Sequence, residues 1–417
     1  MASEASGQDV LSSYHIIDGD AHWTEPPDLW TSRAPASLKG RLPYVKRVNG
    51  RDHWFIENGE SFGHLGTCII DQYGVKHRGI EAPESQDVVD ADVLANFKDP
   101  SRPTFDDVHA AAYDAKARVK LLDELGLWAQ IVYPNAAGLA TMKFMNDVRD
   151  ADLRLALVQI YNDAIAEWQQ ESGGRLLPQA ILPFWDQEAL EREARRAVED
   201  LGLHGLVISD KPEQIGLPNF TTSYWAGFWD FCASTGTPVN FHVGGNLDAS
   251  PIMKMPWDSF GPEAWMAITA PLFAMGSART IMCFIYSGIL DKYPGLKLVS
   301  VESGIGWVPY FLEAMEYQLD EMMPNEGKAL RRRPKEYFRD HFYTTFWFER
   351  EALKNLEAIG PGNILVETDY PHPTCLYPHR EHFASVFQDV KPEYRRRILQ
   401  DNAAELYRVA LPEPATV

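Results

Sequence analysis

The chain has 417 residues, enough for one large α/β barrel with insertions or for two to three average domains. Its 45% hydrophobic content supports a sizeable core, and its formal net charge of −20 argues against nucleic acid or an anionic membrane as a partner. No apolar run approaches the length of a membrane span, and residues 1–9 lack the basic and apolar parts of a signal peptide. The four cysteines are scattered with no CxxC pair, as in reduced proteins, so we expect a cytoplasmic protein.

The first predicted strand covers residues 15–22 and ends in Asp18-Gly-Asp20-Ala-His22. Residues 40–100 do not alternate strand and helix. They contain a predicted hairpin over residues 48–56, turning through residues 57–60, and then acidic segments with Pro and Gly. We interpret residues 40–100 as an insertion within one domain of residues 1–417, lying over one end of the core as a lid.

From residue 106 onward, predicted helices and strands alternate. Gly126, Gly173-Gly174 and Gly236 mark helix ends. The predicted helices cover residues 106–126, 146–172, 187–202, 223–236, part of 246–292, a segment ending near 323, 349–359 and 391–409. The predicted strands cover residues 128–133, 176–184, 205–209, 238–242, 296–302, 342–348 and 364–369. With the first strand they make eight, which predicts a distorted (β/α)8 TIM barrel with an insertion after strand one. An open doubly wound sheet is the alternative, but no glycine-rich phosphate fingerprint follows an early strand.

Polar side chains stand at the ends of the first, fifth, sixth and eighth predicted strands. Side chains alternate along a strand, so Asp20 and His22 share a face with Asp18. Because the βα loops of a barrel converge at its C-terminal mouth, we expect five residues to meet there: Asp20, His22, His242, Glu302 and Asp369. For Asp20 and His22 alone, a buried acid–histidine hydrogen bond is the simpler interpretation.

The predicted cluster has the chemistry of a metal site. Two imidazole nitrogens and several carboxylate oxygens suit Zn²⁺, Mn²⁺ or Fe²⁺. So much negative charge in a semi-buried mouth also requires a cation. The five residues offer enough ligands for one divalent ion with room for water, and enough in number for two.

These motifs resemble the amidohydrolase-related (amidohydrolase family 2) metal enzymes, which include aminocarboxymuconate semialdehyde decarboxylase and γ-resorcylate decarboxylase. The resemblance covers nearly the whole chain except residues 40–100. It rests on Asp20-Ala-His22 with Glu25-Pro26 behind it, Phe241-His242-Val-Gly-Gly245, Tyr293-Pro-Gly-Leu-Lys297, Glu367-Thr-Asp-Tyr-Pro-His372 and Asn402-Ala-Ala-Glu-Leu-Tyr407. It implies a distorted TIM barrel with the metal bound by Asp20, His22, His242 and Asp369.

The chain departs from this family at two positions. Many relatives open with His-x-His, where this chain has Asp20-x-His22. The related decarboxylases place a histidine near the end of strand six, where this chain has Glu302. Direct transfer of the decarboxylase mechanism is therefore in doubt.

Two reactions are open, and hydrolysis is narrowly favoured. A metal-activated water would attack the carbonyl of an ester, thioester or amide of a bulky carboxylic acid, with Asp369 taking the proton. Glu302 would bind a second metal, contact the nucleophile or orient His242. The alternative is non-oxidative decarboxylation of an aromatic or enoic acid, with Asp369 protonating the carbon that loses CO2. A metal-dependent binding protein without catalysis is the third and weakest interpretation.

The predicted partners are a small carboxylic acid or acyl substrate and a second copy of the chain. Four residues are candidates for substrate contact: His372, Arg380, Tyr133 and Trp307. Lys211, just past strand four, stands near the place where some amidohydrolases use a carboxylated lysine, although a loop role fits it better. The helix after strand six has apolar positions to spare, which suggests a homodimer.

Overall fold

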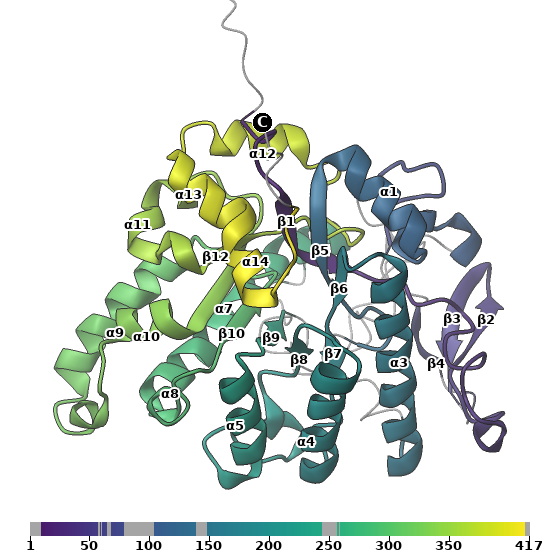
Figure 1. Cartoon of the computed structure of the whole chain (residues 1–417), viewed down its shortest axis with the longest axis horizontal. Helices are drawn as coiled ribbons and strands as arrows, with labels where there is room; N and C mark the ends of the chain where they lie inside the picture. Colours follow the sequence, from purple (N-terminus) through teal and green to yellow (C-terminus); the bar gives the residue numbers. More distant parts are fainter. Residues whose placement is uncertain are drawn as a thin grey trace, which may run out of the picture.

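The computed structural model describes residues 10–56, 59, 61–64, 68–78, 104–138, 148–243, 257 and 259–412 (Figure 1). Its central sheet is built from parallel neighbours in the order β6-β5-β1-β12-β11-β10-β9-β8-β7. The segments are β1 Ile16–His22, β5 Leu127–Tyr133, β6 Leu176–Pro178, β7 Ala180–Ile181, β8 Leu206–Val207, β9 Val239–His242, β10 Leu298–Val301, β11 Phe342–Phe346 and β12 Ile364–Val366.

The two ends of this sheet meet in one strand. Only Gln179 separates β6 from β7. The backbone N–H of Gln179 donates to Val132 O at 2.8 Å on one side, and that of Ala180 donates to Gly205 O at 3.0 Å on the other. The third strand thus pairs with both neighbours and closes the ring. Counted as one strand, β6 and β7 leave eight in the described chain, and the predicted (β/α)8 barrel is confirmed.

The helices surround these strands (Figure 1). Side-chain oxygens of Asp114, Asp150 and Asp186 cap the first turns of three of them, and Gly126 and Gly236 end two in the left-handed conformation. The helices are α1 Ala115–Leu125, α3 Ala151–Glu171, α4 Gln187–Arg195, α5 Ala226–Thr235, α7 Pro262–Tyr286, α8 Ile289–Lys292, α9 Val308–Met322, α10 Pro334–His341, α11 Leu356–Ile359, α12 Arg380–Phe387, α13 Pro392–Arg396 and α14 Asn402–Tyr407.

Two of these helices, α10 and α12, were not predicted. For α10 the local signal was present, because Pro334 occupies its first turn and the side chain of Glu336 accepts from the Arg333 N–H at 2.8 Å. The homodimer stays a prediction; α9, the helix on which it was based, exposes Tyr310, Tyr317 and Met322.

The predicted hairpin belongs to a three-stranded antiparallel sheet made of β2 Tyr44–Val48, β3 Arg51–Phe55 and β4 Ser61–His64, seen beside α3 in Figure 1. Trp54 packs edge-to-face on Trp30, with ring centroids 5.0 Å apart, and the Trp30 indole N–H donates to Leu157 O in α3 at 3.1 Å. Further along the insertion, the Ile69 N–H donates to Pro371 O at 3.0 Å, beside the loop after β12. Residues 79–103 lie outside the described chain, and the lid role stays a prediction.

One expectation about the chain's hydropathy is wrong. Residues 267–286 of α7 have a mean hydropathy of 1.4 and are long enough to cross a membrane. The C-terminal half of α7 packs against the barrel, where Ile281, Phe284 and Ile285 are buried. The N-terminal half exposes Ile268, Leu272 and Met275, so α7 is apolar along its length and only its C-terminal half is a core helix.

The first strand carries an irregularity that places the site. Against β5, Asp18 pairs with Gln130 while Ala21 pairs with Val132, so β1 has one extra residue between these positions. Such a bulge redirects the side chains next to it. At Gly19, an added Cβ would lie 2.9 Å from Val366 O and 3.1 Å from Leu365 Cβ, so β1 approaches β12 too closely for a side chain.

We predict that Gly19→Ala lowers the free energy of unfolding by about 1–3 kcal/mol, because the added methyl group forces β1 and β12 apart. Urea unfolding measures the change. Gly261→Ala is the matched control, since nothing lies within 4 Å of a Cβ added there. Equal stability of the two variants would contradict the prediction.

A second prediction concerns His379, which is buried just before α12 and has no hydrogen-bond partner at either ring nitrogen among the described residues. Burial, reinforced by the Arg380 charge, lowers the pKa of His379 to about 4. Below pH ~6.5 this histidine is protonated in the unfolded chain but stays neutral in the folded chain. The free energy of unfolding therefore decreases as the pH falls from ~6.5 to ~4. Between pH 7 and pH 4.5, wild type should lose about 2–3 kcal/mol more free energy of unfolding than His379→Gln, as urea unfolding at the two pH values would measure. Identical losses would contradict it.

Candidate metal centre

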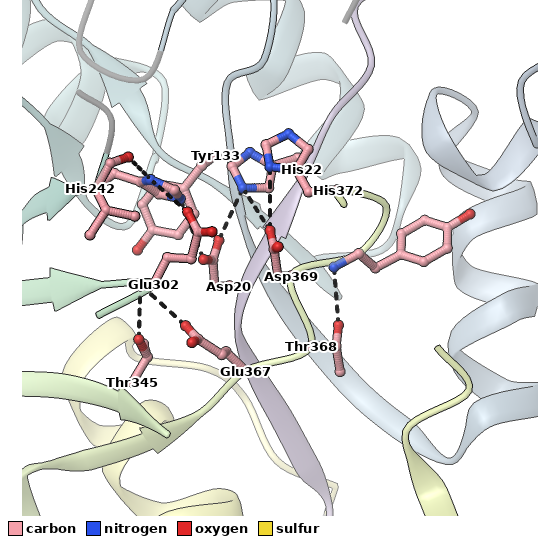
Figure 2. A network of polar contacts seen from close by, with 12 residues as sticks. Asp20, His22, Tyr133, His242, Glu302, Thr345, Glu367, Thr368, Asp369 and His372 are labelled. Atoms are coloured by element: carbon pink, nitrogen blue, oxygen red, sulfur yellow. Dashed lines mark hydrogen bonds and ion pairs between the residues drawn. The ribbon is translucent and has the colours of Figure 1, made fainter. Parts of the chain in front are cut away.

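The structure brings the five predicted metal residues together at one end of the barrel, where β1, β9, β10 and β12 end (Figure 2). His22 Nε2 lies 3.5 Å from Asp20 Oδ1 and 3.3 Å from Asp369 Oδ1. His242 Nε2 lies 3.3 Å from Asp20 Oδ2. The side chains of these four residues are fully buried. Residues separated by up to 349 positions thus share one small volume.

Both histidines present the same nitrogen to the cluster. His22 Nδ1 donates to Pro134 O at 3.1 Å, and His242 Nδ1 donates to Val243 O at 2.8 Å. A carbonyl only accepts, so each Nδ1 carries the proton and each Nε2 keeps its lone pair. Backbone carbonyls commonly orient metal-binding histidines in this way.

The cluster fits a divalent ion. Both carboxylate oxygens of Asp20 and of Asp369, and Nε2 of His22 and of His242, are buried without a hydrogen-bond partner in the described structure. Buried polar atoms are rarely left unpaired. Ligand atoms of Asp20, His22 and His242 lie within 4.8 Å of one another, and so do those of Asp20, Glu302 and Asp369. Imidazole nitrogens with carboxylate oxygens suit zinc, manganese or iron.

The pKa shifts of the cluster residues also favour a bound cation. Burial, and then the Glu302 and Asp20 charges, raise the pKa of Asp369 well above its usual range; burial and Asp18 do the same for Asp20. Burial, and then His372 and His242, lower the pKa of His22. Without a cation, both kinds of side chain are therefore disfavoured in their charged forms. A bound cation reverses this for the carboxylates, because its charge compensates theirs.

Glu302 lies at the edge of the cluster. Its Oε2 is 3.6 Å from His242 Nδ1, and its side chain is 21% exposed. Its backbone N–H donates to Thr345 Oγ1 at 2.9 Å and to Glu367 Oε2 at 3.2 Å. Burial raises the pKa of Glu302 to about 8 against the opposing effect of His242. This geometry allows two of the three roles considered for Glu302, metal ligation and contact with His242.

Glu302 and Asp369 share a strained backbone. Their φ angles are 55° and 58°, in the left-handed region that non-glycine residues rarely adopt. Strain of this kind costs about 1–3 kcal/mol per residue and gathers at functional sites. Both residues follow strands that end at the mouth, so the turn there directs their carboxylates toward the cluster.

Asp18 does not join the cluster, although alternation placed it on the same face as Asp20. Its carboxylate accepts from Thr368 N–H at 2.8 Å, Thr368 Oγ1 at 2.5 Å and Gln130 Nε2 at 2.8 Å. The bulge after Asp18 breaks the alternation. Asp18 therefore ties β1 to β5 and to the residue before Asp369.

A buried arginine that was not predicted supports this layer. Arg118 is fully buried and donates to Gln130 Oε1 at 2.9 Å and to His22 O at 2.7 Å. Its guanidinium also lies 4.6 Å from the centre of the Tyr370 ring. No local signal marked it, because it sits in an ordinary amphipathic helix.

Of the predicted substrate-contact residues, His372 lies closest to the cluster. Its Nδ1 is 3.3 Å from Asp369 Oδ1. Its ring stacks on the His22 ring, with ring centroids 3.5 Å apart. Its Nε2 is buried without a hydrogen-bond partner in the described structure. Trp307 also lies at the mouth, where its indole N–H donates to Ser303 O at 2.9 Å.

The other candidates lie elsewhere. Tyr133 packs beside His242, with ring centroids 5.1 Å apart, but its hydroxyl donates to Asn240 Oδ1 at 3.0 Å inside the barrel. Arg380 Nη1 lies against Gly126, at the start of β5, so the length of that strand, about 20 Å, separates it from the mouth. Lys211 lines a separate cavity of about 590 Å³ with none of the five metal residues in its wall.

A closed α/β barrel with buried histidines and carboxylates at its C-terminal mouth defines a metal-dependent barrel enzyme. The family model described as Amidohydrolase matches residues 107–409. The chain belongs to this amidohydrolase family.

Comparison with individual proteins agrees with the family. The chain is 25% identical over 303 residues to γ-resorcylate decarboxylase from Polaromonas sp. strain JS666, covering 70% of this chain and 86% of that one. An amidohydrolase structure from Mycobacterium avium subsp. paratuberculosis K-10 superposes with a TM-score of 0.66 at 20% identity, covering 94% and 99% of the two chains. The structure of a dihydroxybenzoic acid decarboxylase from Polaromonas sp. JS666, with bound manganese and the inhibitor 2-nitroresorcinol, superposes with a TM-score of 0.54 at 23% identity. This match covers 72% of this chain and 87% of that one.

We predict that Mn²⁺ at 100 times its dissociation constant raises the free energy of unfolding by about 2.7 kcal/mol over chelator-treated protein. Asp20→Asn should abolish this gain. The metal-free variant should nevertheless be at least as stable as metal-free wild type, because it lacks a buried carboxyl group that must either carry a repelled charge or take up a proton. Thermal melts with and without EDTA test both parts, and a full Mn²⁺ response in Asp20→Asn would contradict the assignment.

Proposed function

We propose that this protein is a metal-dependent, non-oxidative decarboxylase of an aromatic carboxylic acid. The observation that carries the proposal is the buried Asp20–His22–His242–Asp369 cluster at the barrel mouth, where neither Asp369 oxygen has a hydrogen-bond partner among the described residues. The Polaromonas relative reported above is named γ-resorcylate decarboxylase, and this supports decarboxylation over the hydrolysis favoured by the sequence. Manganese in the Polaromonas structure supports a divalent ion here.

The metal is assigned to four residues: Asp20, His22, His242 and Asp369. A divalent ion there would supply positive charge that binds the substrate carboxylate together with an adjacent oxygen. His372 is assigned to substrate contact, because its Nδ1 lies 3.3 Å from Asp369 Oδ1 while its Nε2 is buried without a hydrogen-bond partner in the described part of the chain. Trp307, whose indole N–H donates to Ser303 O just after β10, is assigned as an apolar contact for the aromatic ring of the substrate.

Asp369 is assigned to proton delivery. With one Asp369 oxygen assigned to the ion, the other oxygen carries a proton, which passes to the ring carbon that bears the carboxylate, and a C–H bond forms. The C–C bond to the carboxylate then breaks, its electron pair returns to the ring, and CO2 leaves. Asp369 regains a proton from water, so one proton is consumed for each CO2 released.

Hydrolysis remains the second candidate because of Glu302. Where the related decarboxylases have a histidine, this chain has a carboxyl group whose Oε2 lies 3.6 Å from His242 Nδ1. Glu302 also completes a possible ligand group with Asp20 and Asp369. A second ion bound there would favour attack by an activated water on an ester, thioester or amide.

The test is CO2 release from 2,6-dihydroxybenzoate and other hydroxybenzoates by Mn²⁺-loaded protein, beside a panel of aryl esters and thioesters. Asp369→Asn should lower the decarboxylation rate by about 10²–10⁴-fold, as expected when a general acid is lost. Asp389→Asn, at an exposed residue beyond α12, is the control. Turnover of esters without CO2 release from any acid would overturn decarboxylation in favour of hydrolysis.

A further inference from the structure

We propose that Glu25 is a positioning residue for the metal centre: its buried carboxylate fixes residues 134–137 so that the Pro134 carbonyl orients His22 toward the ion. The proposal concerns metal binding and does not depend on which reaction the protein performs.

The Glu25 carboxylate is fully buried and binds three consecutive backbone N–H groups. Its Oε1 accepts from Asn135 at 2.9 Å and from Ala137 at 3.1 Å, and its Oε2 accepts from Ala136 at 2.7 Å. The described structure gives Glu25 no ion pair with Lys or Arg. Successive N–H groups that converge on an anion are a recognised way to stabilise it. Both oxygens are thus used to hold one loop.

The backbone leading to Glu25 is itself fixed on three sides. The His22 N–H donates to Tyr370 O at 2.7 Å, the Trp23 N–H to Tyr133 O at 3.1 Å, and the Thr24 N–H to Ala112 O at 2.9 Å. The backbone around Glu25 is therefore held in place, and its carboxylate in turn holds the loop after β5.

The loop after β5 contacts the metal site through Pro134. Pro134 directly precedes the three residues that Glu25 binds, and its carbonyl accepts from His22 Nδ1 at 3.1 Å. This hydrogen bond leaves His22 Nε2 facing Asp20 and Asp369. Proline has no N–H of its own, so Pro134 depends on the N–H groups that follow it for anchorage. Loss of such outer partners typically weakens metal binding by about 10–100-fold.

The experiment compares Glu25→Gln with Glu193→Gln, a control at a second buried glutamate. Glu193 lies in α4 and binds Asn162 and Arg196, away from the barrel mouth. Titration of metal-free protein gives the Mn²⁺ affinity, and the visible absorption of the Co²⁺-loaded protein reports ligand geometry. A glutamine has one acceptor oxygen for three donors, so Glu25→Gln should weaken Mn²⁺ binding about 10–100-fold and alter the Co²⁺ spectrum.

Glu193→Gln should lower the melting temperature but leave both metal readouts unchanged. Glu25→Asp, which keeps the charge on a shorter side chain, should restore part of the Mn²⁺ affinity lost in Glu25→Gln. A folded Glu25→Gln with wild-type affinity and spectrum would overturn the proposal. So would failure of both Glu25 variants to fold while Glu193→Gln folds, because Glu25 would then serve the whole fold.

Discussion

The structure depends on a concentration of negative charge that the protein alone does not neutralise. Asp20 and Asp369 both lie beside His22 Nε2, and Asp20 also lies beside His242 Nε2, with Glu302 and Glu367 next to them. Burial raises the free energy of each charged carboxylate, and each charge raises it for the others. A cation at the centre would attract each carboxylate and so offset the repulsion between them. The same ion gives the unpaired oxygens and nitrogens partners, so folding, metal binding and chemistry share one requirement.

The barrel meets this requirement by departing from ideal geometry at three positions. A bulge in β1 separates Asp18, which bridges strands, from Asp20, which faces the cluster. Left-handed turns at Glu302 and Asp369 direct their carboxylates at the end of β10 and β12. Each departure costs conformational free energy, and each acts on a residue of the site or on its neighbour. Regular strands with strict alternation would place Asp18 and Asp20 on one face and increase the repulsion there.

Much of this could be predicted from sequence because the signals are local. An apolar run followed by His242 or Asp369 identifies a strand and its polar end, and barrel topology then brings the ends together. The role of Asp18 was not predictable, because a one-residue bulge depends on how closely β1 approaches β12. The stacking of His372 on His22, and the placement of Arg380 at the start of β5, depend on the path of a long loop that follows no periodicity. Arg118 and the Glu25 carboxylate form hydrogen bonds with backbone groups that are distant in sequence. No sequence pattern predicts such contacts.

The pairing of β1 with β12 has a consequence for biosynthesis. Asp18 and Thr368 are 350 residues apart in sequence, and the hydrogen bonds between them join the first and last strands of the ring. Proteins with such distant contacts fold slowly, because a long loop must close before the contact is gained. During translation, Asp20 and His22 emerge long before Asp369 does. The proposed metal site therefore cannot be completed until nearly the whole polypeptide has been synthesised.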